Sequence, residues 1–220
     1  MELRGVSIEL EVWSHTSQLK PHSSLLIKKV NLKVDVLKLI SIFANHIWSI
    51  KYDSDSDDVF TKLLDDWQNV EYLYNFFDYN WNLVIKSDIW KKYTKKDLIM
   101  CVREEAKYMQ SYFLKLYKNS QTGNRPDFDK LFTSLGAEDA KLYNLYRCKA
   151  YGSISKPAIL RLYAIQVETN AYVITGGGIK LTKTMNECKY LENEIEHLNQ
   201  VQKWFKNEGI ESKLELKELK

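Results

Sequence analysis

The run Ile159-Leu-Arg-Leu-Tyr-Ala-Ile-Gln-Val167 decides the fold, together with the turn Glu168-Thr-Asn170 and the run Ala171-Tyr-Val-Ile-Thr175 that follow it. Both runs are rich in β-branched and aromatic residues, and the residues between them are typical of a short hairpin turn. Because both faces of the first run are mostly apolar, it is expected to be a central strand. The core of the predicted fold is therefore an antiparallel hairpin.

A third β-prone run, residues 142–151, precedes this hairpin and completes a predicted three-stranded meander spanning residues 141–183. The glycines at 176–178 are not expected to cradle a nucleotide phosphate, because the chain continues with the alternating Ile-Lys-Leu-Thr instead of opening a helix. They predict a bulge, or a close approach of another segment to a bent strand.

The N-terminal quarter also has strand character. Residues 6–13 and 25–34 alternate between apolar and polar side chains and are predicted to pair as a hairpin, and residues 47–52 alternate in the same way. Between them, residues 36–47 have the spacing of a helix that Asp35 would cap. Helix and strand are difficult to separate there, because β-branched residues are plentiful.

Helices are expected to dominate residues 53–135. The pattern predicts one helix at 58–67 with Asp57 as its cap, a second after Asn69, and a long third after Thr94, where Asp97 completes a capping box. A short helix is expected at 128–135. The aspartates at 53–58 lack the glycine and the glutamate of a calcium-binding loop, so a solvated loop is the simpler interpretation.

The C-terminal part begins with Thr184 and Glu187, which have the spacing of a capping box and predict a helix that ends at Gly209. The fold class is therefore predicted to be α+β, with a small antiparallel sheet, made of the meander and the N-terminal strands, packed against several helices. A single domain, 1–220, is expected, and its sections are N-terminal strands and helix (1–52), a helical region (53–135), the strand meander with its closing helix (141–210) and a charged tail (211–220).

Composition limits the class of protein. The three cysteines and four histidines show no C-x-x-C or H-x-x-x-H pair, which argues for a reducing compartment and against a disulfide framework, a metal site or a cofactor. No signal peptide is evident, and the longest apolar runs fall far short of the ~20 residues of a membrane span. A cytoplasmic protein without membrane contact is the simplest conclusion. The fourteen tyrosines and six tryptophans are expected in the core, with a base-stacking platform as the alternative.

Positive charge is concentrated in residues 141–185. The whole chain has a formal net charge of +3, whereas this segment has a single acid, Glu168, against seven basic residues: Lys141, Arg147, Lys149, Lys156, Arg161, Lys180 and Lys183. A basic β unit in an otherwise slightly acidic protein indicates an anionic partner. Arg161 on a central strand needs either a buried ion pair or a groove into which its guanidinium emerges.

About 55 residues, 131–185, resemble the RelE/HigB-like superfamily of toxins. Leu131-Phe-Thr-Ser-Leu135 and Leu142-Tyr-Asn-Leu-Tyr-Arg147 are similar to the family's "Leu … Leu-Tyr-Glu-Leu-Arg" run, and Ile159-Leu-Arg-Leu-Tyr-Ala164 is similar to its "Arg-hydrophobic-Leu-Tyr" strand. Val173-Ile-Thr-Gly-Gly-Gly-Ile-Lys-Leu-Thr-Lys-Thr184 resembles the HigB pattern of an apolar strand, a glycine and a Lys- and Thr-rich end.

The resemblance implies a metal-independent endoribonuclease of a toxin–antitoxin module, which cleaves mRNA, commonly on the ribosome, and is neutralised by a cognate antitoxin. Arg161 would stabilise the scissile phosphate, and Lys180 and Lys183 would bind the backbone or assist charge stabilisation and proton transfer. The implied catalytic residues are thus Arg161, Lys180 and Lys183, and the candidate RNA-binding residues are Arg147, Lys149, Thr182 and Thr184.

Two departures from the family leave an alternative open. Thr175 and Gly176 stand where HigB proteins often have a histidine, and Asn144 replaces the family's glutamate, so the strand unit lacks a conventional general base. The alternative is a non-catalytic cytoplasmic α+β protein that uses its aromatic, helix-rich half for protein contacts. In that interpretation Lys180 and Lys183 are ordinary exposed lysines at a strand edge.

Overall fold

The structure is a computed structural model that describes residues 37–52, 55–122, 127–135, 145–153, 157–185 and 187–218. The chain divides into two units, Met1–Lys33 and Val34–Lys220, and every described residue lies in the second. The strands predicted at 6–13 and 25–34 lie outside the described residues.

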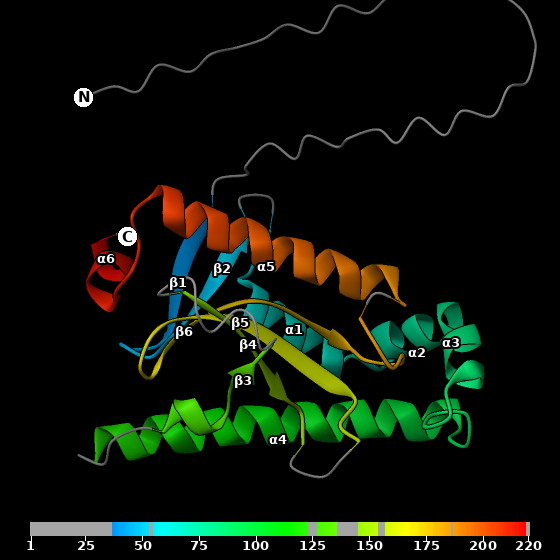
Figure 1. Ribbon diagram of the computed structural model, residues 1–220. Coiled ribbons are helices and arrows are strands. Elements are labelled where there is room, and N and C mark those ends of the chain that lie inside the picture. Colours follow the sequence, from blue (N-terminus) through cyan, green and yellow to red (C-terminus); the bar gives the residue numbers. More distant parts are fainter. Residues whose placement is uncertain are drawn as a thin grey trace, which may run out of the picture. The chain divides into compact units, whose positions relative to one another are not determined.

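The described elements follow one another along the chain as β1 (Leu37–Phe43), β2 (Ile47–Tyr52), α1 (Val59–Gln68), α2 (Val70–Tyr79), α3 (Trp81–Lys86), α4 (Lys95–Gln121), a 3-10 turn (Phe128–Lys130), β3 (Thr133–Ser134), β4 (Tyr146–Tyr151), β5 (Leu160–Glu168), β6 (Ala171–Ile179), α5 (Lys189–Asn207) and α6 (Lys213–Glu218) (Figure 1). The strands form one six-stranded sheet in the order β1-β2-β6-β5-β4-β3. Every neighbouring pair is antiparallel except β2 and β6, which are parallel. The predicted α+β class, the C-terminal meander and the central position of β5 are confirmed.

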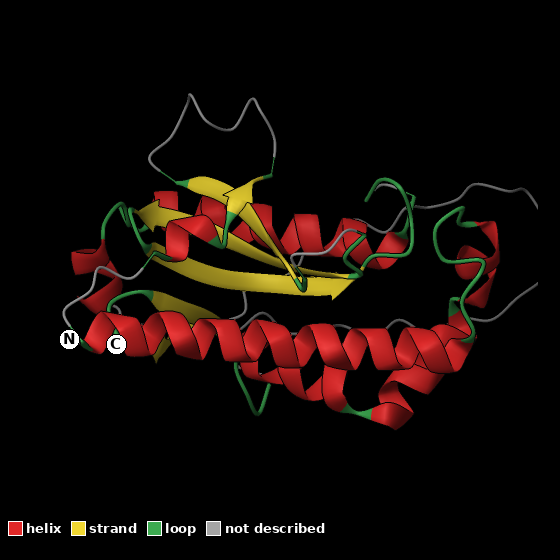
Figure 2. Ribbon diagram, turned by 90° about the horizontal axis from the view of Figure 1, so that it is seen from below, coloured by secondary structure: helices red, strands yellow, loops and turns green. Residues whose placement is uncertain are grey.

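The sheet separates two hydrophobic clusters. One contains buried side chains of α1, α2, α3 and α4, and the other contains those of α5 and α6. α4 and α5 accordingly lie on opposite sides of the sheet in Figure 1, and Figure 2 shows the full length of α4 beside the strands. Alternation along β5 fits this division, because Leu162 belongs to the first cluster and Ile165 to the second.

The helix predicted at 36–47 is wrong, because residues 37–43 form the strand β1. Its β-branched residues pair antiparallel with β2, and a tight turn joins the two strands. In that turn Asn45 has a φ of 66°, and the amide of His46 donates to the carbonyl of Phe43 at 2.9 Å. The strand predicted at 47–52 is confirmed as β2.

Helix caps are mostly as predicted. Asn69 caps α2, and Thr94 and Asp97 form the capping box of α4. Asp58, not Asp57, caps α1, with its Oδ1 accepting from the amide of Phe60 at 2.9 Å. The helix expected at 128–135 is only a 3-10 turn, because the chain then extends to pair as β3 with β4.

The C-terminal part differs from the prediction at the start of its long helix and in its tail. Thr184 donates to Glu187 through its hydroxyl, but α5 begins only at Lys189. The helix ends as predicted at Gly209, which has a φ of 67°. The tail expected at 211–220 is largely helical, because α6 spans 213–218 and buries Leu216 against the α5 side of the sheet.

The three glycines lie inside β6 and are closely covered, as one of the two interpretations predicts. A Cβ on Gly177 would lie 2.9 Å from the carbonyl oxygen of Arg161, and one on Gly178 would lie 2.9 Å from Leu191. The pairing with β5 also shifts here, since Tyr163 opposes Gly176 while Ala164 opposes Ile174. Helices α1 and α5 can thus approach the strand from both faces.

Candidate functional site

Strand register brings the basic residues of β4 and β5 to the α5 face of the sheet. Lys149 lies opposite Tyr163, and Tyr151 lies opposite Arg161. Residues directly opposite one another in antiparallel strands share a face, so two cations and two tyrosines form one surface.

The segment after β6 closes this surface into a groove. The groove has a volume of about 360 Å³ and is lined by Leu135, Lys149, Tyr151, Arg161, Tyr163, Lys180, Lys183, Thr184, Met185 and Ile195. We call it the cationic groove after Lys149, Arg161, Lys180 and Lys183. The described lining contains no carboxylate. Four of the seven candidate residues are thus brought together as cations, and Thr184 joins them.

Arg161 lines the groove and makes no ion pair with a described carboxylate. Of the two alternatives, a buried ion pair or a guanidinium that emerges into a groove, the structure has the second. Nη1 of Arg161 donates to the carbonyl oxygens of Ala158 and Leu160 at 2.9 and 2.7 Å, and its guanidinium carbon lies 4.2 Å from the ring centre of Tyr151. The Nε and Nη2 hydrogens keep no partner among the described residues, so they are available to an anion. Burial lowers the pKa of Arg161.

Lys180 is held by the loop that it precedes. Its Nζ donates to the carbonyl oxygens of Thr182 and Lys183 at 2.5 and 2.6 Å. Burial lowers the pKa of Lys180, the nearby charges of Arg161 and Lys149 lower it further, and the carboxylate of Glu187 opposes this shift. Because β6 is central in the sheet, Lys180 does not follow an edge strand. The cations therefore repel one another, and an anion would relieve that repulsion.

The remaining candidates play other parts. Arg147 does not line the groove, and its Nη1 donates to the Oδ1 of Asn199 on α5 at 2.7 Å. Thr182 uses its hydroxyl to donate to the carbonyl oxygen of Thr184 at 2.6 Å, which shapes the loop. Tyr151 and Tyr163 were not predicted as lining residues, although alternation places both on the face of Arg161.

A buried carboxylate on α4 fixes the start of β5. Glu105 is 7% exposed and accepts hydrogen bonds from the amides of Ile159, at 3.0 Å, and of Leu160, at 2.8 Å. Burial raises the pKa of Glu105. Because these amides immediately precede Arg161, Glu105 positions the segment that carries the guanidinium.

Replacing Glu105 by alanine is expected to lower the free energy of unfolding by about 2–4 kcal/mol, because two buried amides lose their acceptor. Urea denaturation at neutral pH measures this change. Glu104→Ala, an exposed neighbour on the same helix, is the matched control and should change stability by less than about 0.5 kcal/mol. Equal stabilities of the two variants would contradict the role of Glu105.

A second carboxylate without a signal in the sequence is Glu194 of α5, which contacts β6. Oε2 of Glu194 accepts from the amide of Gly177 at 2.9 Å, and burial raises the pKa of Glu194 to about 7. It lies over Gly176, which pairs with the groove residue Tyr163. Glu194 does not line the groove itself.

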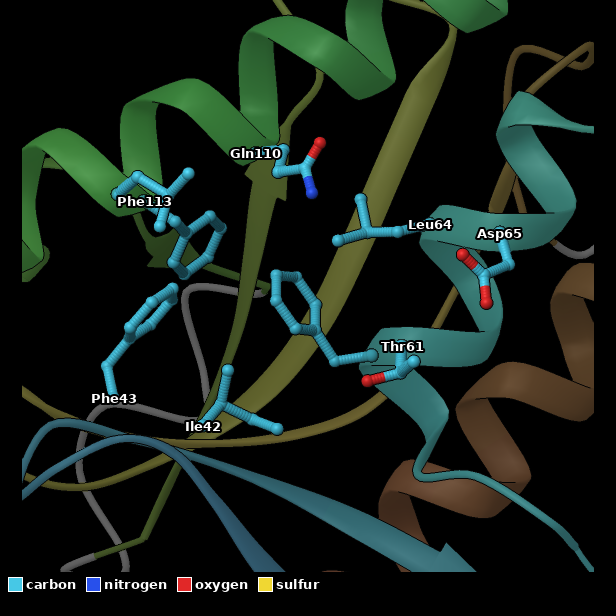
Figure 3. A pocket seen from close by; sticks show the side chains of 9 residues that line it. Ile42, Phe43, Thr61, Leu64, Asp65, Gln110 and Phe113 are labelled. Atoms are coloured by element: carbon cyan, nitrogen blue, oxygen red, sulfur yellow. The ribbon is translucent and has the colours of Figure 1, made fainter.

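An apolar cavity of about 250 Å³ lies between β1, α1 and α4 (Figure 3). Phe43 and Phe113 approach each other across it, while Asp65 and Gln110 lie at its rim. Its charged residue is an aspartate, which would repel a phosphate. The cationic groove is therefore the better candidate for an anionic ligand.

No group of three or more His, Cys, Asp or Glu side chains among the described residues could hold a metal ion. Within the same part of the chain, no helix combines the length and apolar character that a membrane span requires. No family model matches the chain, and neither a curated protein nor a solved structure matches it. The resemblance to RelE/HigB-like toxins stays a prediction.

Proposed function

We propose that the protein acts on RNA in the cytoplasm, holding phosphates of the strand in the cationic groove and cleaving the strand without a metal ion. The observation that carries the proposal is the convergence of four cations in a groove whose described lining has no carboxylate. Fixed cations on a rigid sheet provide what phosphate binding and phosphoryl-transfer transition states both require. The RelE/HigB-like resemblance adds mRNA, the ribosome and a cognate antitoxin as proposed partners.

The proposed reaction is attack by a ribose 2′-hydroxyl on the adjacent phosphorus. The O2′–P bond forms, the P–O5′ bond breaks, and the products are a 2′,3′-cyclic phosphate and a 5′-hydroxyl. The 2′-hydroxyl proton leaves to water or to a lysine amine, and the 5′ oxygen takes a proton from a lysine ammonium or from water. Arg161 and Lys180 would stabilise the charge that develops on the phosphate oxygens.

The test is incubation of the purified protein with a defined mRNA in a translating extract and, in a parallel reaction, with the mRNA alone in EDTA, followed by mapping of new 5′ ends. Internal cleavage that leaves 5′-hydroxyl ends is the expected result. An mRNA that stays intact, with and without translation, would remove the ribonuclease activity from the proposal.

A second candidate function is binding to another protein without catalysis. Several large apolar side chains of α2, α3 and the turn after them are exposed: Val70, Tyr74, Tyr79, Ile85 and Ile89. An mRNA that the protein neither binds nor cleaves would favour this function.

A further inference from the structure

A polar cavity shares a loop with the cationic groove. It has a volume of about 490 Å³ and lies where the junction of α2 and α3 faces the N-terminus of α5. Glu187 lines this cavity and accepts from the amide of Thr184 at 3.0 Å, while Thr184 lines the groove. Three residues of extended chain span at most about 11 Å, so these two wall residues lie within the reach of a single nucleotide.

The cavity lining is rich in amides without partners. The side chains of Asn82 and Asn193 form no hydrogen bond within the described part of the chain, although both line the cavity. An amide presents an acceptor and two donors in one plane, which is the pattern that pairs with the edge of a nucleobase. At the same cavity Tyr79 is 89% exposed, so its ring contributes nothing to the core. Exposed aromatic rings are the platforms on which unpaired bases stack.

The charges of the two sites are complementary to the two parts of a nucleotide. The groove offers four cations to a phosphate, whereas the described lining of the cavity has one carboxylate, Glu187, and one cation, Lys189, and therefore no net charge. A neutral base suits the cavity better, and a carboxylate can accept from its amino group.

We propose that the cavity is a nucleobase subsite, in which the base of a nucleotide bound through its phosphate in the cationic groove stacks on Tyr79 and is recognised by Asn82 and Asn193. The inference rests on the proposed action on RNA and adds base selectivity to it. Single-stranded RNA is the substrate class, because the faces of paired bases are stacked within the duplex and are not free to stack on Tyr79.

The test measures binding of fluorescent RNA decamers to the full chain by anisotropy. The strands are oligo-A, oligo-C, oligo-U, an alternating A and G strand, and an abasic strand with the same number of phosphates. The variants are Asn82→Ala/Asn193→Ala and Tyr79→Ala. Asn75→Ala and Tyr74→Ala are the matched controls, because both residues are exposed on α2 and neither lines the cavity.

The wild type is expected to bind at least one base-bearing strand about tenfold more tightly than the abasic strand. The cavity variants should lose this preference and keep their affinity for the abasic strand, and the controls should keep both. Equal binding of all strands, lost in Lys180→Ala, would overturn the base subsite and leave the proposed function standing. No binding of any strand would overturn both.

Discussion

Replacing Arg161 and Lys180 together by alanine is expected to weaken binding of a single-stranded RNA by at least about a hundredfold at low salt. Each side chain offers charge-assisted hydrogen bonds to a phosphate, worth about 1.5–3 kcal/mol apiece. The two effects will not be additive, because removal of either cation relieves the repulsion that it exerts on the other. Anisotropy titrations of the wild type and of both single variants measure the coupling.

The matched control is Lys107→Ala/Lys115→Ala, which removes the same charge from exposed positions of α4, on the opposite side of the sheet. Salt dependence separates specific contacts from net charge. The slope of log affinity against log salt should fall by about 1.4 in the groove variant, for two lost phosphate contacts, and much less in the control. An equally large loss in both double variants would show that net charge alone binds the RNA. In cells, toxicity of the wild type should be absent from the groove variant.

The hairpin β5–β6 could be predicted because its information is local. A run that is apolar on both faces, a short turn and a second β-prone run lie within about twenty residues, and all three signals agree. Helix α4 was equally clear, since Thr94, Asp97 and an apolar stripe lie on one continuous segment. Strand β1 could not be predicted, because the spacing of its apolar residues fits both a helix and a strand. Its pairing with β2 is what makes the segment a strand.

The candidate site could be predicted in part, because some of its residues also lie close together in the sequence. Arg161, Lys180 and Lys183 lie in one stretch whose charge is visible in the sequence. Glu105 and Glu194 were missed because neither has a local signal. The first contacts an amide 54 residues away, and the second contacts Gly177 across the interface between α5 and β6. A carboxylate on an amphipathic helix resembles any solvated acid until the packing of that helix is known.

Titration of Glu194 is expected to lower the stability of the protein as pH rises from about 4.5 to 7, whereas His46 and His197, whose pKa values burial lowers, act in the opposite direction. The pKa of Glu194 is raised from the ordinary value of 4.5 to about 7 by burial, so in this interval the folded state binds a proton that the unfolded state has lost. Ionisation of Glu194 lowers the free energy of unfolding progressively across this interval, and the decrease is complete above pH 7. The expected loss is about 2 to 3 kcal/mol, somewhat less than the whole shift implies because the carboxylate is only partly buried.

Glu194→Gln isolates this contribution. The glutamine keeps an acceptor for the amide of Gly177 and carries no charge, so its stability should lack this pH dependence and should exceed that of the wild type at pH 8. Glu196→Gln, an exposed glutamate on the same helix, is the matched control and should follow the wild type. Urea unfolding at pH 5, 6, 7 and 8 gives the comparison. If Glu194→Gln and the wild type lose stability in parallel, Glu194 is not the titrating group, because the variant has nothing to ionise.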